Sequence, residues 1–136
     1  MGYRSDVRIL VNKKGLEYLK ERTIAYAKQY YEANENETWA KPYCEKSELE
    51  EWKIISTDYD DEIILEQSSI KWDTYYVDVK WIYNALSDLT EAHLPYQLIS
   101  IGEDGRYEES SNLYDEDDEM EDLKTEMFVE VNFNFQ

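Results

Sequence analysis

The sequence has little of the chemistry on which most metalloproteins and nucleotide-dependent enzymes rely. Its 136 residues include one cysteine, one histidine, two prolines and four glycines. Because Cys44 is the only cysteine, an internal disulfide and a zinc site built from several thiolates are excluded. The glycines at positions 2, 15, 102 and 105 have neither Walker nor dinucleotide-loop spacing. We therefore expect neither a metal nor a cofactor.

Long apolar segments are also missing. No run approaches the roughly 18 residues that a membrane-spanning helix requires, and residues 1–6 lack the apolar core of a secretory signal. Myristoylation needs Ser or Thr where this chain has Asp6. We expect no membrane contact and a cytoplasmic location, where a reducing environment suits a chain that cannot form an internal disulfide.

Positive charge is scarce beyond the first third of the chain. Residues 1–44 have eight Lys or Arg and six Asp or Glu, whereas residues 45–136 have six and twenty-six, so the two parts carry +2 and −20 of the net −18. Such acidity repels nucleic acid and attracts basic protein surfaces, so direct nucleic-acid binding is not expected. The 42% hydrophobic and 15% aromatic content indicates a folded chain, and its length indicates a single domain, residues 1–136.

The spacing of the apolar residues predicts eight elements of secondary structure. Alternation of apolar and polar residues is typical of strands, and steps of three and four residues are typical of helices. In chain order, these are a strand at 6–11, a helix between Asn12 and Asn34, strands at 52–57 and 62–72, a helix from Asp73 or Thr74 to between Asp88 and His93, and strands at 96–101, 106–113 and 127–135.

The order β-α-β-β-α-β-β-β predicts an α+β fold. We expect an antiparallel sheet of about five to six strands with two helices on one face, related to the ferredoxin-like plan. The polar residues that follow Asn34, and then Pro42, predict a loop over residues 34–47. Within the strand at 62–72, the apolar face changes at Ser68-Ser69, which predicts a bulge or a break.

The strongest functional signal is the segment 115–122, in which seven of eight residues are acidic. One interpretation is a solvated loop, because long blocks of like charge are commonly disordered. The other is a polyanionic surface that binds a groove evolved for DNA, whose axis carries about one charge per 1.7 Å. The predicted partner-binding residues are Asp115, Glu116, Asp117, Asp118, Glu119, Glu121 and Asp122, the turn acids Glu103 and Asp104, and Tyr107 and Tyr114 as aromatic anchors.

These acids match no calcium or catalytic motif. An EF-hand loop needs alternating acids, a glycine at its sixth position and a glutamate at its twelfth, which neither 58–62 nor 115–122 supplies. Glu103 and Asp104 lack the Lys or His that a nuclease site requires, and acids beside glycines commonly stabilise turns. His93 is expected to complement the C-terminal dipole of the second helix. We therefore predict no catalytic residues.

Three short segments resemble a group of small phage and prophage proteins of unassigned function. They are the opening Met-Gly-Tyr-Arg-Ser-Asp-Val, the segment Ile70-Lys71-Trp72, and residues 99–104 with the sequence Ile-Ser-Ile-Gly-Glu-Asp. The resemblance implies a setting in which small acidic accessory proteins inhibit host enzymes, including as anti-CRISPR proteins and DNA mimics. Our leading hypothesis is a non-enzymatic inhibitor of a host protein with a basic nucleic-acid-binding groove, such as a CRISPR effector.

Two further functions are open from the sequence. Thirteen tyrosines suit the edge of a core, and equally a binding surface or a pocket. A tyrosine-lined pocket for a signalling nucleotide would need clustered basic residues, for which Arg4, Arg8 and Arg22 are the candidates. A phage structural or assembly subunit is the other alternative, and the oligomeric state is left open.

Overall fold

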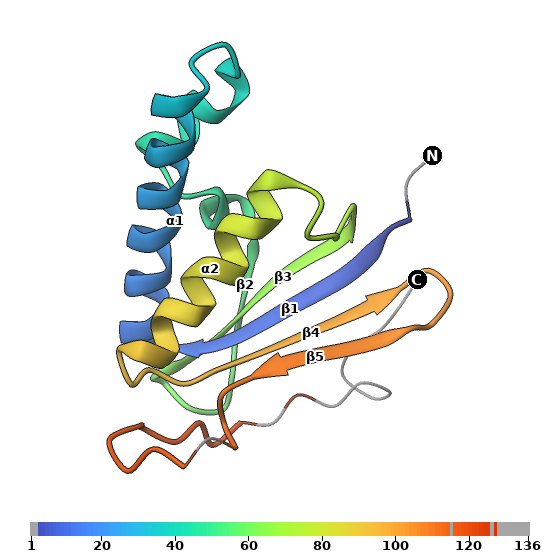
Figure 1. The fold of residues 1–136 in the computed structure, drawn as a ribbon. Coiled ribbons are helices and arrows are strands. Elements are labelled where there is room, and N and C mark those ends of the chain that lie inside the picture. Colours follow the sequence, from blue (N-terminus) through green and yellow to red (C-terminus); the bar gives the residue numbers. More distant parts are fainter. Residues whose placement is uncertain (1–2, 115, 126, 128–136) are drawn as a thin grey trace.

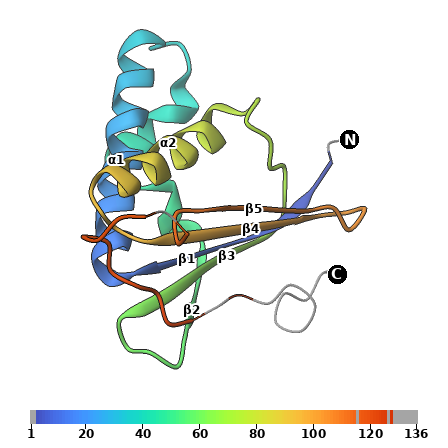
Figure 2. The same cartoon turned by 60° about the horizontal axis from the view of Figure 1, so that its bottom comes forward.

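The computed structural model describes residues 3–114, 116–125 and 127, which form an α+β fold. One antiparallel sheet of five strands has both long helices on one of its faces (Figures 1 and 2). In chain order, the elements are β1 (Ser5–Asn12), α1 (Lys13–Ala33), the short 3₁₀ helices η1 (Thr38–Cys44) and η2 (Glu48–Glu51), β2 (Lys53–Ser56), β3 (Glu62–Ile70), α2 (Val77–Glu91), β4 (Tyr96–Gly102) and β5 (Tyr107–Ser111).

The strand order is β2-β3-β1-β4-β5. Strand β1 lies at the centre and pairs antiparallel with both β3 and β4. Because β3 also pairs antiparallel with β2, β1 and β2 run in the same direction with β3 between them. This is the split β-α-β arrangement of the ferredoxin-like plan, so the predicted fold class is confirmed. Strand β5 extends this plan as a hairpin partner of β4.

The sheet separates two clusters of buried side chains. On the helix-covered face, β1 contributes Val7, Ile9 and Val11, which pack against the apolar faces of α1 and α2. On the opposite face, the sheet residues include Leu10 and Ile99, and the C-terminal segment supplies Leu123 and Met127 to the same cluster. The chain after β5 therefore returns across the sheet face that the helices leave open (Figure 2). Most of the final strand predicted at 127–135 lies outside the described residues.

The phase change predicted in the third strand is a β-bulge. Val7 pairs with Gln67 and Ser5 pairs with Ile70, so the two serines face the single residue Asp6. Ser69 has a positive φ of 53°, and its amide donates a 2.8 Å hydrogen bond to the buried carboxylate of Asp6. A side chain on the central strand thus satisfies an amide that the bulge removes from the ladder.

Two boundary predictions were wrong. The segment predicted as a loop at 34–47 contains η1, because Trp39 stacks on Trp81 of α2 at 5.6 Å and so brings this segment onto the helices. Helix α2 begins at Val77 rather than at Asp73 or Thr74. Asp73 instead forms a turn before the helix, in which its carboxylate accepts a hydrogen bond from the amide of Tyr75. Among the described residues, neither helix is long and apolar enough to cross a membrane.

Candidate functional site

The acidic segment crosses the end of the sheet at which β1 ends and β3 and β4 begin (Figure 1). It follows β5, and its described part covers residues 116–122. We call this part, together with the turn acids Asp58, Asp60 and Asp61, the acidic surface. The sequence left open whether such a run is a free loop or a defined surface, so its contacts with the fold decide which description applies.

The segment is attached to the body of the protein at three places. After the end of α2, His93 contacts the carboxylates of Asp117 and Glu119, at 2.6 and 3.0 Å. Asn12 donates a 3.0 Å hydrogen bond from Nδ2 to Glu121. Beyond the segment, the amides of residues 124 and 125 both donate to the carboxylate of Glu62. The segment is therefore held by side chains from β1, from β3 and from the residues that follow α2.

Glu62 is the buried carboxylate among these attachment points. Its side chain lies in the first position of β3 and is only 6% exposed. The carboxylate receives the amide of Lys124 at 2.7 Å and that of Thr125 at 2.9 Å. Two backbone donors satisfy this buried charge, and in return the carboxylate fixes the point at which the chain turns onto the open sheet face.

His93 brings positive charge to an otherwise negative region. It has a φ of 60° just after α2, where a left-handed residue commonly ends a helix. In the imidazolium form both ring nitrogens donate, one to Asp117 and one to Glu119. The hydrogen bond to Asp117 raises the pKa of His93. This attachment is therefore present at low pH and is lost as the pH rises through the raised pKa.

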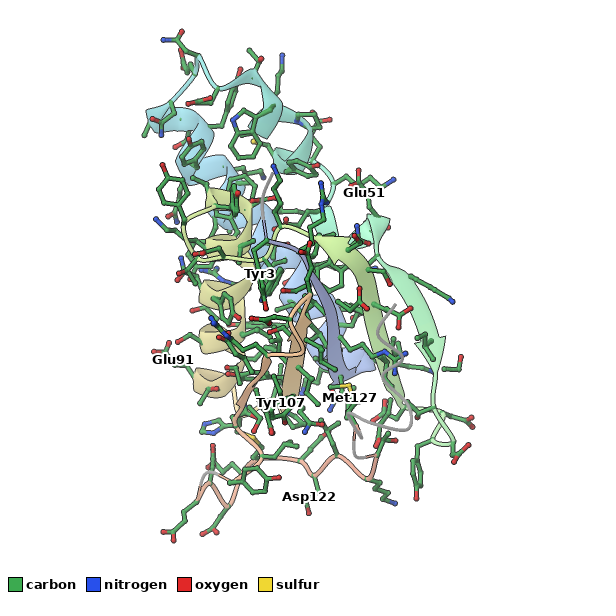
Figure 3. All side chains as sticks on the ribbon, turned by 90° about the vertical axis from the view of Figure 1, so that its right-hand side faces the viewer. Tyr3, Glu51, Glu91, Tyr107, Asp122 and Met127 are labelled. Carbon is green, nitrogen blue, oxygen red and sulfur yellow. The ribbon has the colours of Figure 1, made fainter. Side chains whose placement is uncertain are left out.

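A second acidic segment lies beside the first. The turn between β2 and β3 and the end of the acidic segment enclose a hollow of about 470 Å³, whose lining includes Asp58, Asp60, Asp61 and Asp122. Lys124 also lines it, and its ammonium lies 5.7 Å from the centre of the Tyr59 ring. Acids that are about sixty positions apart in the sequence thus line one hollow, and Asp122 lies at the lower end of the molecule in Figure 3.

The structure does not bring all the predicted binding residues together. Tyr107 begins β5, and Glu103 and Asp104 lie in the preceding turn. The acidic segment instead follows the other end of β5, so roughly five residues of strand, or about 16 Å, separate the two groups. Tyr114 is 83% exposed and lies next to the acidic segment in the chain. Asp115 lies outside the described residues.

The two acids of the β4–β5 turn, Glu103 and Asp104, interact with the N-terminal segment. The hydroxyl of Tyr3 donates to Asp104, and the amide of Arg4 donates to Glu103 at 3.0 Å. The Tyr3 hydrogen bond lowers the pKa of Asp104. A side chain at Gly102 would overlap the Tyr3 ring, so this glycine leaves the space in which the contact forms. These two acids therefore connect the hairpin tip to β1 and are separate from the acidic surface.

The arginines considered for a nucleotide phosphate do not form a cluster. Arg8 pairs with Glu66 at 2.7 Å, and Arg22 pairs with Asp88 of α2 at 2.8 Å. Arg4 donates to the carbonyl of Ser69. Arg4 and Arg8 are held by residues of β3 and Arg22 by a residue of α2, so the predicted phosphate site is not assembled from these three residues. Within the described parts of the chain, no group of three or more His, Cys, Asp or Glu side chains is placed to hold a metal ion.

Several residues of this site were missed by the sequence interpretation. Glu62 and Asn12 hold the acidic segment, and the acids of the β2–β3 turn extend it. The acids of the β2–β3 turn were visible in the sequence as a second acidic group. Only the pairing of β3 with β1 places them beside the acidic segment. Comparisons of the chain with protein-family models, curated proteins and solved structures find no match.

Asn12 offers a test of how the segment is held. Its Oδ1 caps α1 by accepting from the amide of Gly15 at 2.7 Å, while its Nδ2 donates to Glu121. We expect Asn12→Ser to keep the cap, because serine caps helices well, and Asn12→Ala to cost about 1 kcal/mol. Both variants remove the donor to Glu121. Hydrogen exchange over residues 116–122 should therefore accelerate in both, and unchanged exchange in both would contradict the attachment.

Proposed function

We propose that this protein is a non-enzymatic inhibitor whose acidic surface occupies the nucleic-acid-binding groove of a partner protein. The observation that carries the proposal is that His93, Asn12 and Glu62 hold the segment in place, while its last residue, Asp122, lines one hollow with the acids of the β2–β3 turn. Fixed carboxylates present a defined array, so less side-chain and loop ordering opposes binding than with a free acidic loop.

The partner class follows from the charge. A groove that binds nucleic acid is lined by Lys and Arg, which gain affinity by replacing the counterions of a polyanion. An acidic surface of comparable density competes for the same side chains and is steered to them during encounter. The resemblance to small phage proteins supports a phage-encoded protein that acts in the host cytoplasm, and a CRISPR effector is the most specific form of this partner.

The test uses a variant that removes charge while keeping the attachments. It carries Glu116→Gln, Asp118→Asn and Asp122→Asn, with Asp58→Asn and Asp60→Asn in the turn. Asp117, Glu121 and Glu62 are left intact because they hold the segment. The immobilised wild-type protein should capture a nucleic-acid-binding protein from host lysate and release it when duplex DNA is added. The affinity of the variant should be about 100-fold lower or more near 0.15 M salt.

The matched control removes five charges elsewhere. The exposed acids Glu17, Glu21, Glu32, Glu35 and Glu45 lie on α1 and in the region of η1, and their conversion to glutamine gives the same change in net charge. This control should bind like the wild type. Equal loss in both variants would show that only net charge matters, and a captured partner that duplex DNA does not displace would contradict the proposed groove.

A further inference from the structure

A second site lies at the other end of the molecule, between η2 and the start of α2. Figure 3 places Glu51 there, far from Asp122 of the acidic surface. The cavity has a volume of about 350 Å³, within the range of small-molecule sites. We call it the Glu48 pocket. The residues on which the argument depends are Glu48, Glu51, Asp78, Trp52, Trp72 and Tyr43.

Glu48 is an unusual residue to find in the wall of a pocket. It is only 8% exposed, and its Oε1 is buried without a hydrogen-bond partner among the described residues. Burial raises the pKa of Glu48 to about 9, and the charges of Asp78 and Glu51 add to the effect. At neutral pH the carboxyl group of Glu48 is therefore protonated. Buried polar atoms are nearly always paired, so the unpaired oxygen indicates a donor that a ligand would bring.

The carboxyl groups of η2 and α2 converge on this pocket. Glu48 and Glu51 belong to η2, and Asp78 lies in the first turn of α2. Tyr43 lies beside these acids, and burial together with Glu51, Glu48 and Asp78 raises its pKa. The charged and titratable groups that line the pocket are Arg4, Tyr43, Glu48, Glu51, Lys71, Tyr76 and Asp78. Arg4 directs one guanidinium nitrogen to the carbonyl of Ser69, 2.7 Å away.

Aromatic rings complete the walls. Trp52 and Trp72 meet edge to face, with ring centres 5.9 Å apart, and both line the cavity. Tyr43 and Tyr76 line it as well. Carboxylates combined with aromatic faces favour organic cations, which gain from charge pairing and from the ring quadrupole together. A metal ion would instead require a ring of oxygen ligands.

We propose that the Glu48 pocket binds an organic cation, namely an alkylguanidinium or alkylammonium group, whose N–H donors bond to Oε1 of Glu48. Binding pairs the carboxylate with the cation, so the protonated acid releases its proton to solvent as the ligand enters. The free protein carries that proton and the complex does not. One proton is therefore released for each ligand bound, and affinity should increase as the pH rises toward 9.

Isothermal titration at neutral pH tests this directly. The probes are n-butylguanidinium and its neutral isostere n-butylurea, measured in buffers of different ionisation enthalpy. We expect the cation to bind with release of about one proton and the urea to bind at least tenfold more weakly. Glu48→Gln should weaken binding of the cation at least tenfold and abolish proton release. Equal binding of cation and urea, or binding without proton release, would overturn the proposal.

Two variants keep the test interpretable. Glu50 lies on the same short helix, but it pairs with Lys20 at 2.6 Å and does not line the pocket. The Glu50→Gln variant should therefore bind the cation like the wild type. Asp78→Asn should weaken binding even if Glu48→Gln folds poorly, which thermal unfolding of each variant reports. Unchanged affinity in a folded Asp78→Asn and a folded Glu48→Gln variant contradicts the site.

The cation has two possible sources, which two further probes distinguish. Agmatine represents a free small amine, and N-acetyl-arginine N-methylamide represents a side chain of another protein. Preferential binding of agmatine assigns the pocket to a free ligand, whereas preferential binding of the blocked arginine assigns it to a protein side chain. If neither probe binds, the proposed cation site is refuted. The five-residue variant of the acidic surface leaves this pocket intact, so the two proposals stand or fall separately.

Discussion

The free energy of unfolding should fall steadily between about pH 5 and about pH 9, and Glu48→Gln should remove most of that fall. Burial beside Asp78 and Glu51 raises the pKa of Glu48 from 4.5 to about 9. Between these values the folded state keeps a proton that the unfolded state has lost. Raising the pH therefore favours the unfolded state.

The expected size follows from the two pKa values. Stability should decrease by about 1.4 kcal/mol for each pH unit in this interval, which accumulates to ~6 kcal/mol near pH 9. Typical domains have only about 5–15 kcal/mol in total, so the wild type should be far less stable in mild alkali. Glutamine resembles the protonated acid in shape and cannot ionise, so the variant should lack this dependence.

Urea unfolding at one-unit pH steps and constant ionic strength measures the effect. The informative quantity is the difference in unfolding free energy between Glu48→Gln and wild type, because other titrating groups, including His93, contribute to both. This difference should grow with pH. Glu50→Gln is the control. Lys20 lowers the pKa of Glu50, so the contribution of Glu50 to the free energy of unfolding is already complete above pH 5. A constant difference for Glu48→Gln would refute the assignment.

The sequence predicted the elements that repeat a pattern and missed those that depend on distant partners. Alternation in β1 and the three-to-four-residue spacing in α1 are local signals, and both elements form where expected. Even the β-bulge at Ser69 was visible as a change of phase. Helix η1 had no such signal, because its position depends on Trp39 meeting Trp81, which lies about forty residues later.

The acidic surface and the Glu48 pocket show the same difference between local patterns and contacts with distant residues. The acids of 116–122 were evident from composition, but their attachment requires Asn12 and Glu62 to lie at one end of the sheet, which only strand pairing specifies. Glu48 was one of several glutamates in a polar segment. Its significance comes from burial and from Asp78, which lies thirty positions later. Local patterns therefore identify which residues are acidic, and tertiary packing decides which acids are exposed, attached or neutralised.

Trp81→Ala should destabilise the protein by about 3–5 kcal/mol, the usual effect of truncating a buried tryptophan. Trp81 is 4% exposed and lies at the centre of an aromatic cluster, with Tyr30 at 5.8 Å and Trp39 at 5.6 Å between ring centres. Tyr43 of η1 also contacts it at 6.2 Å. Its loss leaves a cavity between α1, α2 and η1.

Trp39→Ala gives the matched comparison, because Trp39 stacks on the same ring at an interplanar angle of 22° but is 42% exposed. Its truncation should cost about 1 kcal/mol, and the double variant should reveal a coupling of about 0.5–1.5 kcal/mol. Urea unfolding of the four proteins completes the cycle. Additive effects would mean that η1 is held by other contacts. Coupling of the expected size would show that this pair fixes η1 on the helices, and with it Tyr43 in the wall of the Glu48 pocket.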